Sequence, residues 1–275
     1  MMAEFERAGA IAQVIETAGR KAEQMRLAGL QVDQKGPGDF VTQVDRTLDR
    51  DLSAAFYDLF PQDVVISEEN SDSVGRFGGG EGRFWCIDPV DGTRDFIETG
   101  RNYAVMVGAL QGGEAQAGWV YEPAADRMYF GGWGWGLYCR EGDGVKDCYP
   151  QPPMQPGRVI VGDADRDNYG AQLREILPEI EVWNRPGSFG LKIIDVILGR
   201  AEALLYFNGR VKLWDTVGPM ALARQAGLRI CDLTGAPLSF SDLDGATLGH
   251  RQAIILGWPH AVENYLLRLG QLRIR

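Results

Sequence analysis

The chain has 275 residues and a net charge of −10, with 45% hydrophobic and 24% charged residues. This length is enough for one large domain or two closely joined halves, and the composition is typical of a globular protein. The negative charge argues against nucleic acid as a partner, because such binding needs cations that displace counterions from phosphates. The negative net charge is compatible with an anionic small-molecule substrate if bound divalent cations reverse the electrostatic field at the binding site.

Cysteine usage and hydropathy indicate a cytoplasmic protein without a membrane partner. No C-x-x-C pair is present, so reduced and mostly buried thiols are expected. No run of about 18 apolar residues exists for a membrane span. Glu4 and Glu16 interrupt the apolar residues of the N-terminus, which excludes a signal peptide there. The cysteines are Cys86, Cys139, Cys148 and Cys231.

The first part of the chain predicts helices followed by a sheet. Apolar residues at helical spacing predict a helix within residues 1–30, and a second helix is expected from Asp45 to Phe60. Short apolar runs at 64–66 and 84–87 predict strands, and residues 103–138 predict an antiparallel sheet broken by turns.

A glycine-rich stretch and a pair of tryptophans also allow structural predictions. The glycine-rich stretch from Gly75 to Gly82 is expected to be a mobile loop, able to act as a lid over Glu68. Trp133 and Trp135 are expected to pack within strands, since large aromatic residues dominate cores.

A proline-rich stretch from Cys148 to Gly157 marks the one internal boundary, beyond which strands and helices alternate. We therefore expect an N-terminal α+β half at 1–148 and a C-terminal α/β half at 149–275, together one layered α/β domain. In the second half, strands are expected at 159–161, near 182, at 203–207, near 230 and at 253–256, and helices at 171–177, 189–198, 216–225 and 261–269.

Carboxylates stand where predicted strands end and where a helix begins. Asp88 and Asp91 follow the strand at 84–87, where a turn is expected, Glu68 follows the strand at 64–66, and Asp215 falls in the first turn of a helix. Rigid elements of this kind can hold several carboxylates at one point. Oxygen ligands suit Mg²⁺, and a chain with only two histidines offers little to zinc.

Each of these carboxylates alone has a simpler explanation. Acidic residues at strand ends and helix starts are common as helix caps and as solvated turn residues. The residues therefore indicate a metal site without establishing one. A hydrolytic triad is not indicated, because neither His250 nor His260 accompanies a recognisable nucleophile.

The acidic residues lie in motifs that resemble those of the inositol monophosphatase superfamily, the magnesium-dependent, lithium-sensitive phosphatases. Residues 88–96, DPVDGTRDF, are similar to the family's D-P-[IVL]-D-G-T-x-N-F, and residues 214–218, WDTVG, to W-D-x-A-[AG]. Residues 67–69, SEE, resemble [GS]-E-E, and residues 35–45 resemble K-x(2,4)-D-x-V-T-x-x-D. The four motifs occur in the family's order and cover nearly the whole chain.

This resemblance implies a fold and a set of roles. The fold would be the α-β-α-β-α sandwich of the inositol monophosphatase and fructose-1,6-bisphosphatase type, often a homodimer, with two or three Mg²⁺ ions. Asp45 and Thr93 would act with Glu68 on the attacking water, and Asp91, Gly92 and Thr93 would hold the phosphate. The implied metal ligands are Glu68, Asp88, the carbonyl of Val90, Asp91 and Asp215.

Departures from the family pattern bear on the substrate. Asp95 replaces the usual asparagine, and residues 206–210 lack the glutamate that grips a ring hydroxyl in inositol phosphatases, leaving Asn208 or Tyr206 there. The stretch containing Ser188 and Lys192 is more similar to the 3′(2′),5′-bisphosphate nucleotidase branch, whose lysine helps to hold a second phosphate.

The preferred substrate is therefore 3′-phosphoadenosine 5′-phosphate, hydrolysed to AMP. An inositol phosphate or fructose 1,6-bisphosphate is the alternative within the superfamily. A non-catalytic regulatory or binding protein is the alternative of another class. For Lys192, an ordinary surface position on a helix is as well supported as a substrate contact.

Overall fold

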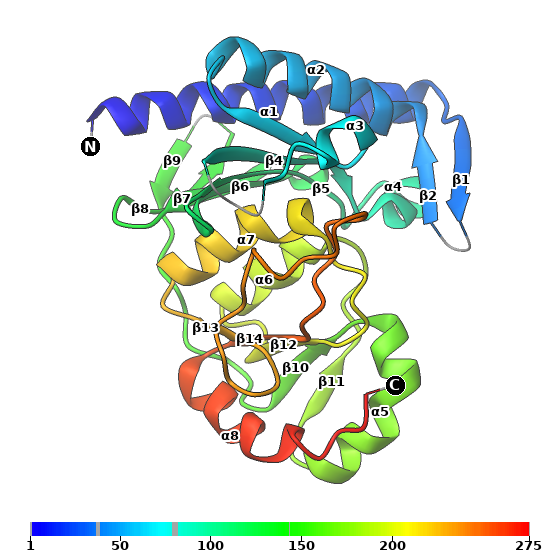
Figure 1. The fold of residues 1–275 in the computed structure, drawn as a ribbon, viewed down its shortest axis with the longest axis vertical. Coiled ribbons are helices and arrows are strands. Elements are labelled where there is room, and N and C mark those ends of the chain that lie inside the picture. Colours follow the sequence, from blue (N-terminus) through cyan, green and yellow to red (C-terminus); the bar gives the residue numbers. More distant parts are fainter. Residues whose placement is uncertain (1, 37–38, 79–81, 143, 275) are drawn as a thin grey trace.

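The computed structural model describes residues 2–36, 39–78, 82–142 and 144–274 (Figure 1). The helices are α1 (Met2–Ala28), α2 (Gln43–Leu59), α3 (Ser71–Val74), α4 (Thr93–Thr99), the 3₁₀ helix η1 (Pro123–Ala125), α5 (Asp163–Ile176), α6 (Phe189–Ile197), α7 (Leu213–Gln225) and α8 (Pro259–Leu269). The strands are β1 (Val32–Gly36), β2 (Asp39–Thr42), β3 (Val64–Ser67), β4 (Arg83–Asp91), β5 (Ala104–Gln111), β6 (Glu114–Glu122), β7 (Arg127–Gly132), β8 (Gly136–Glu141), β9 (Gly144–Asp147), β10 (Arg158–Val161), β11 (Glu181–Trp183), β12 (Ala203–Tyr206), β13 (Arg229–Cys231) and β14 (Ile254–Gly257).

The elements stack in the order helix, sheet, helix, sheet, helix (Figure 1). Helices α1 and α2 cover one face of a seven-stranded sheet of order β3-β4-β5-β6-β7-β8-β9. Helices α6 and α7 fill the space between this sheet and a five-stranded sheet of order β11-β10-β12-β14-β13, and α5 and α8 close the far side. The predicted α-β-α-β-α sandwich is confirmed.

Helix α2 shows how the sequence fixes one of these layers. Leu48, Leu52 and Phe56 recur at helical spacing and are completely or almost completely buried against the large sheet. The helix begins at a capping box, in which Thr42 and Asp45 satisfy each other's backbone N–H groups. Because Asp45 belongs to this cap, its position is set by the start of the helix.

Strand β4 is longer than the sequence predicts and irregular at its end. It runs parallel to β3 and antiparallel to β5, and its register with β5 shifts between Asp88 and Asp91. Residues three apart in a regular strand face opposite sides of the sheet. The irregularity resets this alternation, so that both side chains reach the same site, whereas the sequence placed them in a turn beyond the strand.

Helix α7 lies unusually close to the large sheet because glycines meet at the contact. A Cβ on Gly118 would stand 2.0 Å from the carbonyl oxygen of Gly218, and a Cβ on Gly108 would stand 2.3 Å from the Gly218 nitrogen. No side chain fits between these backbones. The contact places the first turn of α7, with Asp215, beside the end of β4.

Several local expectations are corrected by the structure. Residues 133–135 form a turn, in which Trp135 packs on Trp119 while Trp133 is 60% exposed and lies under Arg224. Helix α5 begins at Asp163, well before the predicted start, because its first turn is polar and hides the periodic pattern. Strands β1, β2 and β9 lack the apolar runs that reveal the others.

Other expectations fall partly or wholly within the described residues. The four cysteines are buried and unpaired, as predicted. Two predicted segments lie partly outside the described residues. These are the glycine-rich loop, at residues 79–81, and the motif at residues 35–45, at residues 37–38 and at the side chains of Lys35 and Asp39. None of the described helices is both long and apolar enough for a membrane span. The division into halves at residue 148 stays a prediction.

The glycine contact under α7 yields a stability test. Gly118→Ala should lower the free energy of unfolding by about 1–3 kcal/mol, because the new methyl group overlaps backbone rather than a flexible side chain. Gly144→Ala is the matched control, since a Cβ there meets only the Glu141 carbonyl at 3.6 Å. Urea denaturation of both variants measures the difference, and equal stabilities would contradict the proposed contact.

Candidate metal centre

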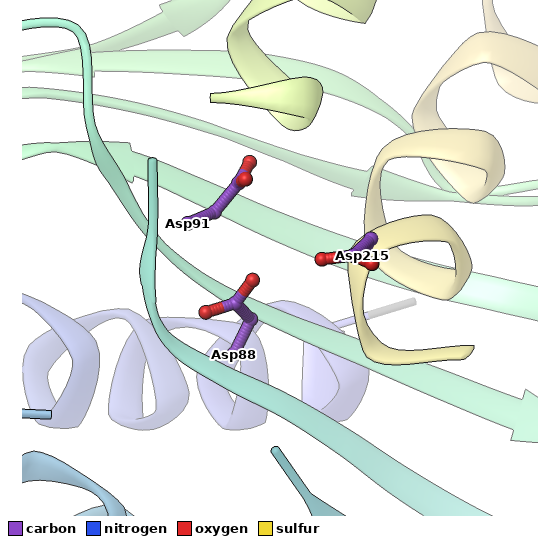
Figure 2. Close-up of side chains that lie close together, drawn as sticks. All are labelled: Asp88, Asp91 and Asp215. Carbon is purple, nitrogen blue, oxygen red and sulfur yellow. The ribbon is translucent and has the colours of Figure 1, made fainter. Parts of the chain in front are cut away.

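Three carboxylates from two elements converge at the end of β4. Asp88 and Asp91 extend from the strand and Asp215 from the first turn of α7, and the three side chains lie close together (Figure 2). One oxygen from each lies within 4.8 Å of the others. Asp88 and Asp91 are 1% and 8% exposed, and Asp215 is half-buried, so the two strand carboxylates are removed from bulk water. Among the described residues, the sequence-predicted acids thus form a group of metal-binding dimensions.

Glu68 lies beside this group rather than within it. Its backbone N–H donates to the carbonyl of Ile87 over 3.2 Å, which fixes the end of β3 against β4 next to Asp88. Its charge acts on Asp88, where it raises the pKa of that carboxyl further than burial alone does. Three of the predicted ligands therefore cluster, with the charge of Glu68 acting on Asp88, and the full ligand set with the Val90 carbonyl stays a prediction.

The electrostatics of the cluster call for a cation. Burial, with repulsion from Glu68 and Asp91, raises the pKa of Asp88 well above its usual range. Burial and the neighbouring Asp91 charge raise the pKa of Asp215 to about 7, and the Asp88 and Asp215 carboxyls share a hydrogen bond. A divalent ion would remove this repulsion, and a donor set of oxygens alone fits Mg²⁺ better than zinc.

Asp91 is held by the start of helix α6. Its Oδ2 accepts the hydroxyl of Ser188, the N-cap residue, and the N–H of Gly190 over 2.9 Å. These hydrogen bonds and the Lys192 charge oppose the burial that raises the Asp91 pKa. Ser188, predicted to contact substrate, also accepts the Leu191 N–H over 3.0 Å, so in this structure its hydroxyl orients Asp91.

The predicted pair of Thr93 and Asp45 is present. The Thr93 hydroxyl lies 3.3 Å from Oδ1 of Asp45 and 3.0 Å from the carbonyl oxygen of Val90. The other oxygen of Asp45 accepts the Thr42 N–H over 2.8 Å. A threonine hydroxyl placed between a carboxylate and the metal cluster can pass a proton from water to that carboxylate.

Comparison with known proteins decides the family. The profile of the inositol monophosphatase family matches residues 3–256 of the chain. The chain belongs to the inositol monophosphatase family. It is accordingly a phosphatase of small phosphate monoesters, in a family whose members depend on metal ions.

Curated relatives of this inositol monophosphatase family member carry several names. The fructose-1,6-bisphosphatase/inositol-1-monophosphatase of Aquifex aeolicus is 29% identical, over 77% of this chain and 79% of its own. The inositol-1-monophosphatase of Bacillus subtilis is 25% identical, over 86% and 89%. The Nus factor SuhB of Xylella fastidiosa is 26% identical, over 89% and 88%.

Solved structures share the fold. The crystal structure of SaIMPase-II with inositol monophosphate bound has a TM-score of 0.73 at 23% identity, covering 96% of this chain and 95% of its own. The same protein with 2′AMP bound has a TM-score of 0.75 at 22% identity, covering 97% and 93%. These similarities agree with the layered architecture described above.

The loop at residues 206–210, where the family pattern has a glutamate, is held by hydrogen bonds of Asn208. Asn208 donates from Nδ2 to Oδ2 of buried Asp165 over 3.2 Å, and its Oδ1 accepts the Arg210 N–H over 3.0 Å. Both ends of the amide are thus engaged within the loop and its support. The predicted contact of Asn208 with substrate stays a prediction, and the neighbouring Tyr206 is left beside the Asp215 charge.

Gly92 has a conformation and a packing position that suit only glycine. Its φ is +93°, and a Cβ would lie 2.9 Å from the Ser188 nitrogen and 3.0 Å from the Asn102 carbonyl. Gly92 and Thr93 begin α4, where N–H groups have no partner within the helix. Their predicted role as phosphate donors is consistent with this position and is not tested by it.

Sequence reasoning missed the residues that hold the start of α6. Arg185 donates to Asp195 over 2.6 Å and to the side-chain carbonyl of Asn102 over 2.9 Å, and the Asn102 backbone carbonyl accepts the Ser188 N–H over 2.8 Å. This network ties the loop after α4 to the helix that orients Asp91. Arg185 and Ser188 lie about 80 to 90 residues from Asn102 along the chain, so no local pattern reveals their contacts with it.

The raised carboxyl pKa values predict how stability depends on pH. A carboxyl whose pKa is higher in the folded state binds protons more tightly there, so the metal-free protein loses stability as pH rises from about 4 toward 7. The melting temperature of the metal-free protein should fall across this pH range, once the contribution of its other titrating groups has been subtracted. Asp215→Asn should reduce the fall, and an unchanged slope in this variant would contradict the assignment.

Proposed function

We propose that this family member is a Mg²⁺-dependent phosphatase in which water attacks a small phosphate monoester directly. The single observation that carries the proposal is the cluster of Asp88, Asp91 and Asp215 within 4.8 Å, two of them buried, with the charge of Glu68 acting on Asp88. Bound Mg²⁺ would supply charge neutralisation of the phosphoryl oxygens and activation of water.

The chain's own residues have separate tasks in this proposal. The carboxylates of Glu68, Asp88, Asp91 and Asp215, with the carbonyl of Val90, hold two or three ions. This is the predicted ligand set, and the clustered carboxylates support it.

The proton of the attacking water passes by way of Thr93. The Thr93 hydroxyl accepts it while donating its own proton toward Asp45, and Glu68 orients the water. The 3.3 Å separation of Thr93 Oγ1 and Asp45 Oδ1 supports this relay.

For the substrate, an inositol monophosphate is the first candidate. Curated relatives are named inositol-1-monophosphatase, and SaIMPase-II binds inositol monophosphate in a structure of the same fold. Fructose 1,6-bisphosphate belongs to the same class of sugar and polyol phosphates, and a relative is named for both activities.

A nucleotide with a 2′- or 3′-phosphate, such as 3′-phosphoadenosine 5′-phosphate, is the second candidate. No carboxylate occupies residues 206–210 to grip a polyol hydroxyl. Lys192 is half-buried near Asp91, with its Nζ 2.7 Å from the Gly187 carbonyl, and offers a cation for a second phosphate. The structure of SaIMPase-II with 2′AMP bound, a protein of the same fold, supports this candidate.

Asp91→Asn tests the reaction. The variant should lose more than about a hundredfold in kcat, since even outer-shell partners of a metal site cost 10–100-fold. The amide oxygen can still accept the Ser188 and Gly190 bonds, so circular dichroism and melting temperature should show a folded protein.

Asp95→Asn is the matched control for Asp91→Asn. It makes the same chemical change four residues away and installs the family's usual residue. Phosphate release with Mg²⁺ measures both variants. Full activity of Asp91→Asn, or equal loss in the two, would refute the mechanism.

Lys192→Met tests the substrate class. With purified inositol 1-phosphate, 2′-AMP and 3′-phosphoadenosine 5′-phosphate, the variant should lose about tenfold more in kcat/KM for the bisphosphate than for inositol phosphate, because a hydrogen bond to a second charged group is lost. The ratio between substrates removes any general effect of the charge beside Asp91. A constant ratio would assign Lys192 to support of Asp91 alone and favour the inositol phosphate.

Three further properties implied by the sequence and the resemblance remain proposals. Inhibition of phosphate release by Li⁺ is expected, as is a homodimer in light-scattering measurements. A cytoplasmic location is expected from the reduced cysteines.

A further inference from the structure

A cavity of about 190 Å³ lies between helix α1 and the large sheet, apart from the metal centre. It lies on the face of the sheet covered by α1 and α2, whereas α7 with Asp215 lies on the other face (Figure 1). Strand β4 connects the two places, with Arg83 at the cavity and Asp91 at the metal centre. Nothing in the proposed reaction uses this cavity.

The register of the sheet explains why the cavity exists. Trp85, Ala109, Ala117 and Gly132 are paired in one row across β4, β5, β6 and β7. The row has a large residue at one end and two methyl groups in its middle. At the other end the indole of Trp135 occupies the space that a side chain on Gly132 would take. A trough therefore forms between two tryptophans.

Aromatic rings line the walls of this trough. Phe60, at the end of α2, stacks on Trp85 with ring centroids 4.4 Å apart. Trp119 lies 6.1 Å from Trp85 and 6.2 Å from Trp135, and so connects the two ends. Ile11 of α1 contributes aliphatic surface to the lining. Flat apolar walls around a small volume fit a ligand of one or two aromatic rings.

The rim of the trough is polar and positively charged. Arg7, Arg83 and Gln111 are exposed and line its opening. Arg83 is partly engaged, at 3.2 Å from Gln111 and 3.8 Å from Asp63. Arg7 makes no hydrogen bond or ion pair within the described part of the chain, so its guanidinium is the cation left for a ligand.

We propose that this trough is a binding site for a small planar aromatic carboxylate, with its rings between Trp85 and Trp135 and its carboxylate at Arg7. The apolar walls recognise the rings, and the rim arginine distinguishes an anion from a neutral molecule of the same shape. The site is independent of the proposed phosphatase reaction, because it shares no residue with the metal centre.

Calorimetric titration with indole-3-acetate and its neutral isostere indole-3-acetamide tests the proposal. The carboxylate should bind saturably and about fivefold tighter than the amide, the upper end for an ion pair at an exposed rim. Arg7→Met should abolish this preference, whereas Arg174→Met, at an exposed arginine of α5, should retain it. Ala117→Leu, which fills the trough, should weaken both ligands more than tenfold.

Each alternative result overturns the proposal. These are absence of saturable binding, equal affinities for the two ligands in the unaltered chain, and a preference that survives Arg7→Met. If Ala117→Leu fails to fold, the exposed Arg7→Met variant and the ligand comparison still decide. Asp91→Asn should bind indole-3-acetate as the unaltered chain does, and lost binding there would place the ligand at the metal centre instead.

Discussion

The mutual repulsion of buried carboxylates is the constraint on which the rest of this structure depends. Asp88, Asp91 and Asp215 are brought within 4.8 Å of one another, with the first two buried and the third half-buried. Burial and like charge both disfavour their ionised forms, and the raised pKa values express that cost. The fold must supply the free energy that keeps them together until cations arrive.

Two backbone features supply this rigidity. The irregular end of β4 turns two carboxylates to one side, and the glycine contact between α7 and the sheet brings the third from another layer. Neither feature can yield easily, because the irregular end of β4 is paired with β5, and α7 meets the sheet backbone against backbone. Hydrogen bonds from Ser188 and Gly190 to Asp91 then offset part of the electrostatic cost locally.

The sequence predicts the layers and the acidic residues because both have local patterns. Helical spacing reveals α2, and apolar runs ending in acids reveal β3 and β4. It could not predict the irregularity at Asp88, since a register shift depends on pairing with a strand elsewhere in the chain. The capping box of Thr42 and Asp45, by contrast, was available as a local signal for the position of Asp45.

Long-range partners account for the remaining differences. Asn208 contacts Asp165, 43 residues earlier in the chain, and no local pattern indicates this partner. Trp133 was expected to pack within a strand but is exposed. Its partner Arg224 lies in a distant part of the chain, so no local pattern indicates this contact. The pair of Thr93 and Asp45, 48 residues apart, was indicated by the family resemblance rather than by a local pattern.

The same electrostatic constraint gives a physical reason for the departure at residues 206–210. A glutamate there would add a further negative charge beside a group of acids that already repel one another. Burial and the Asp215 charge raise the pKa of Tyr206, so its phenol stays neutral and can still donate or accept a hydrogen bond. A neutral tyrosine and a hydrogen-bonded Asn208 in place of an acid lower the repulsion among the carboxylates. They also remove a charged group that could bind a substrate hydroxyl. The rings of Phe189 and Tyr206 lie 5.6 Å apart at this position, and Lys192 near Asp91 is the proposed cation for a second phosphate.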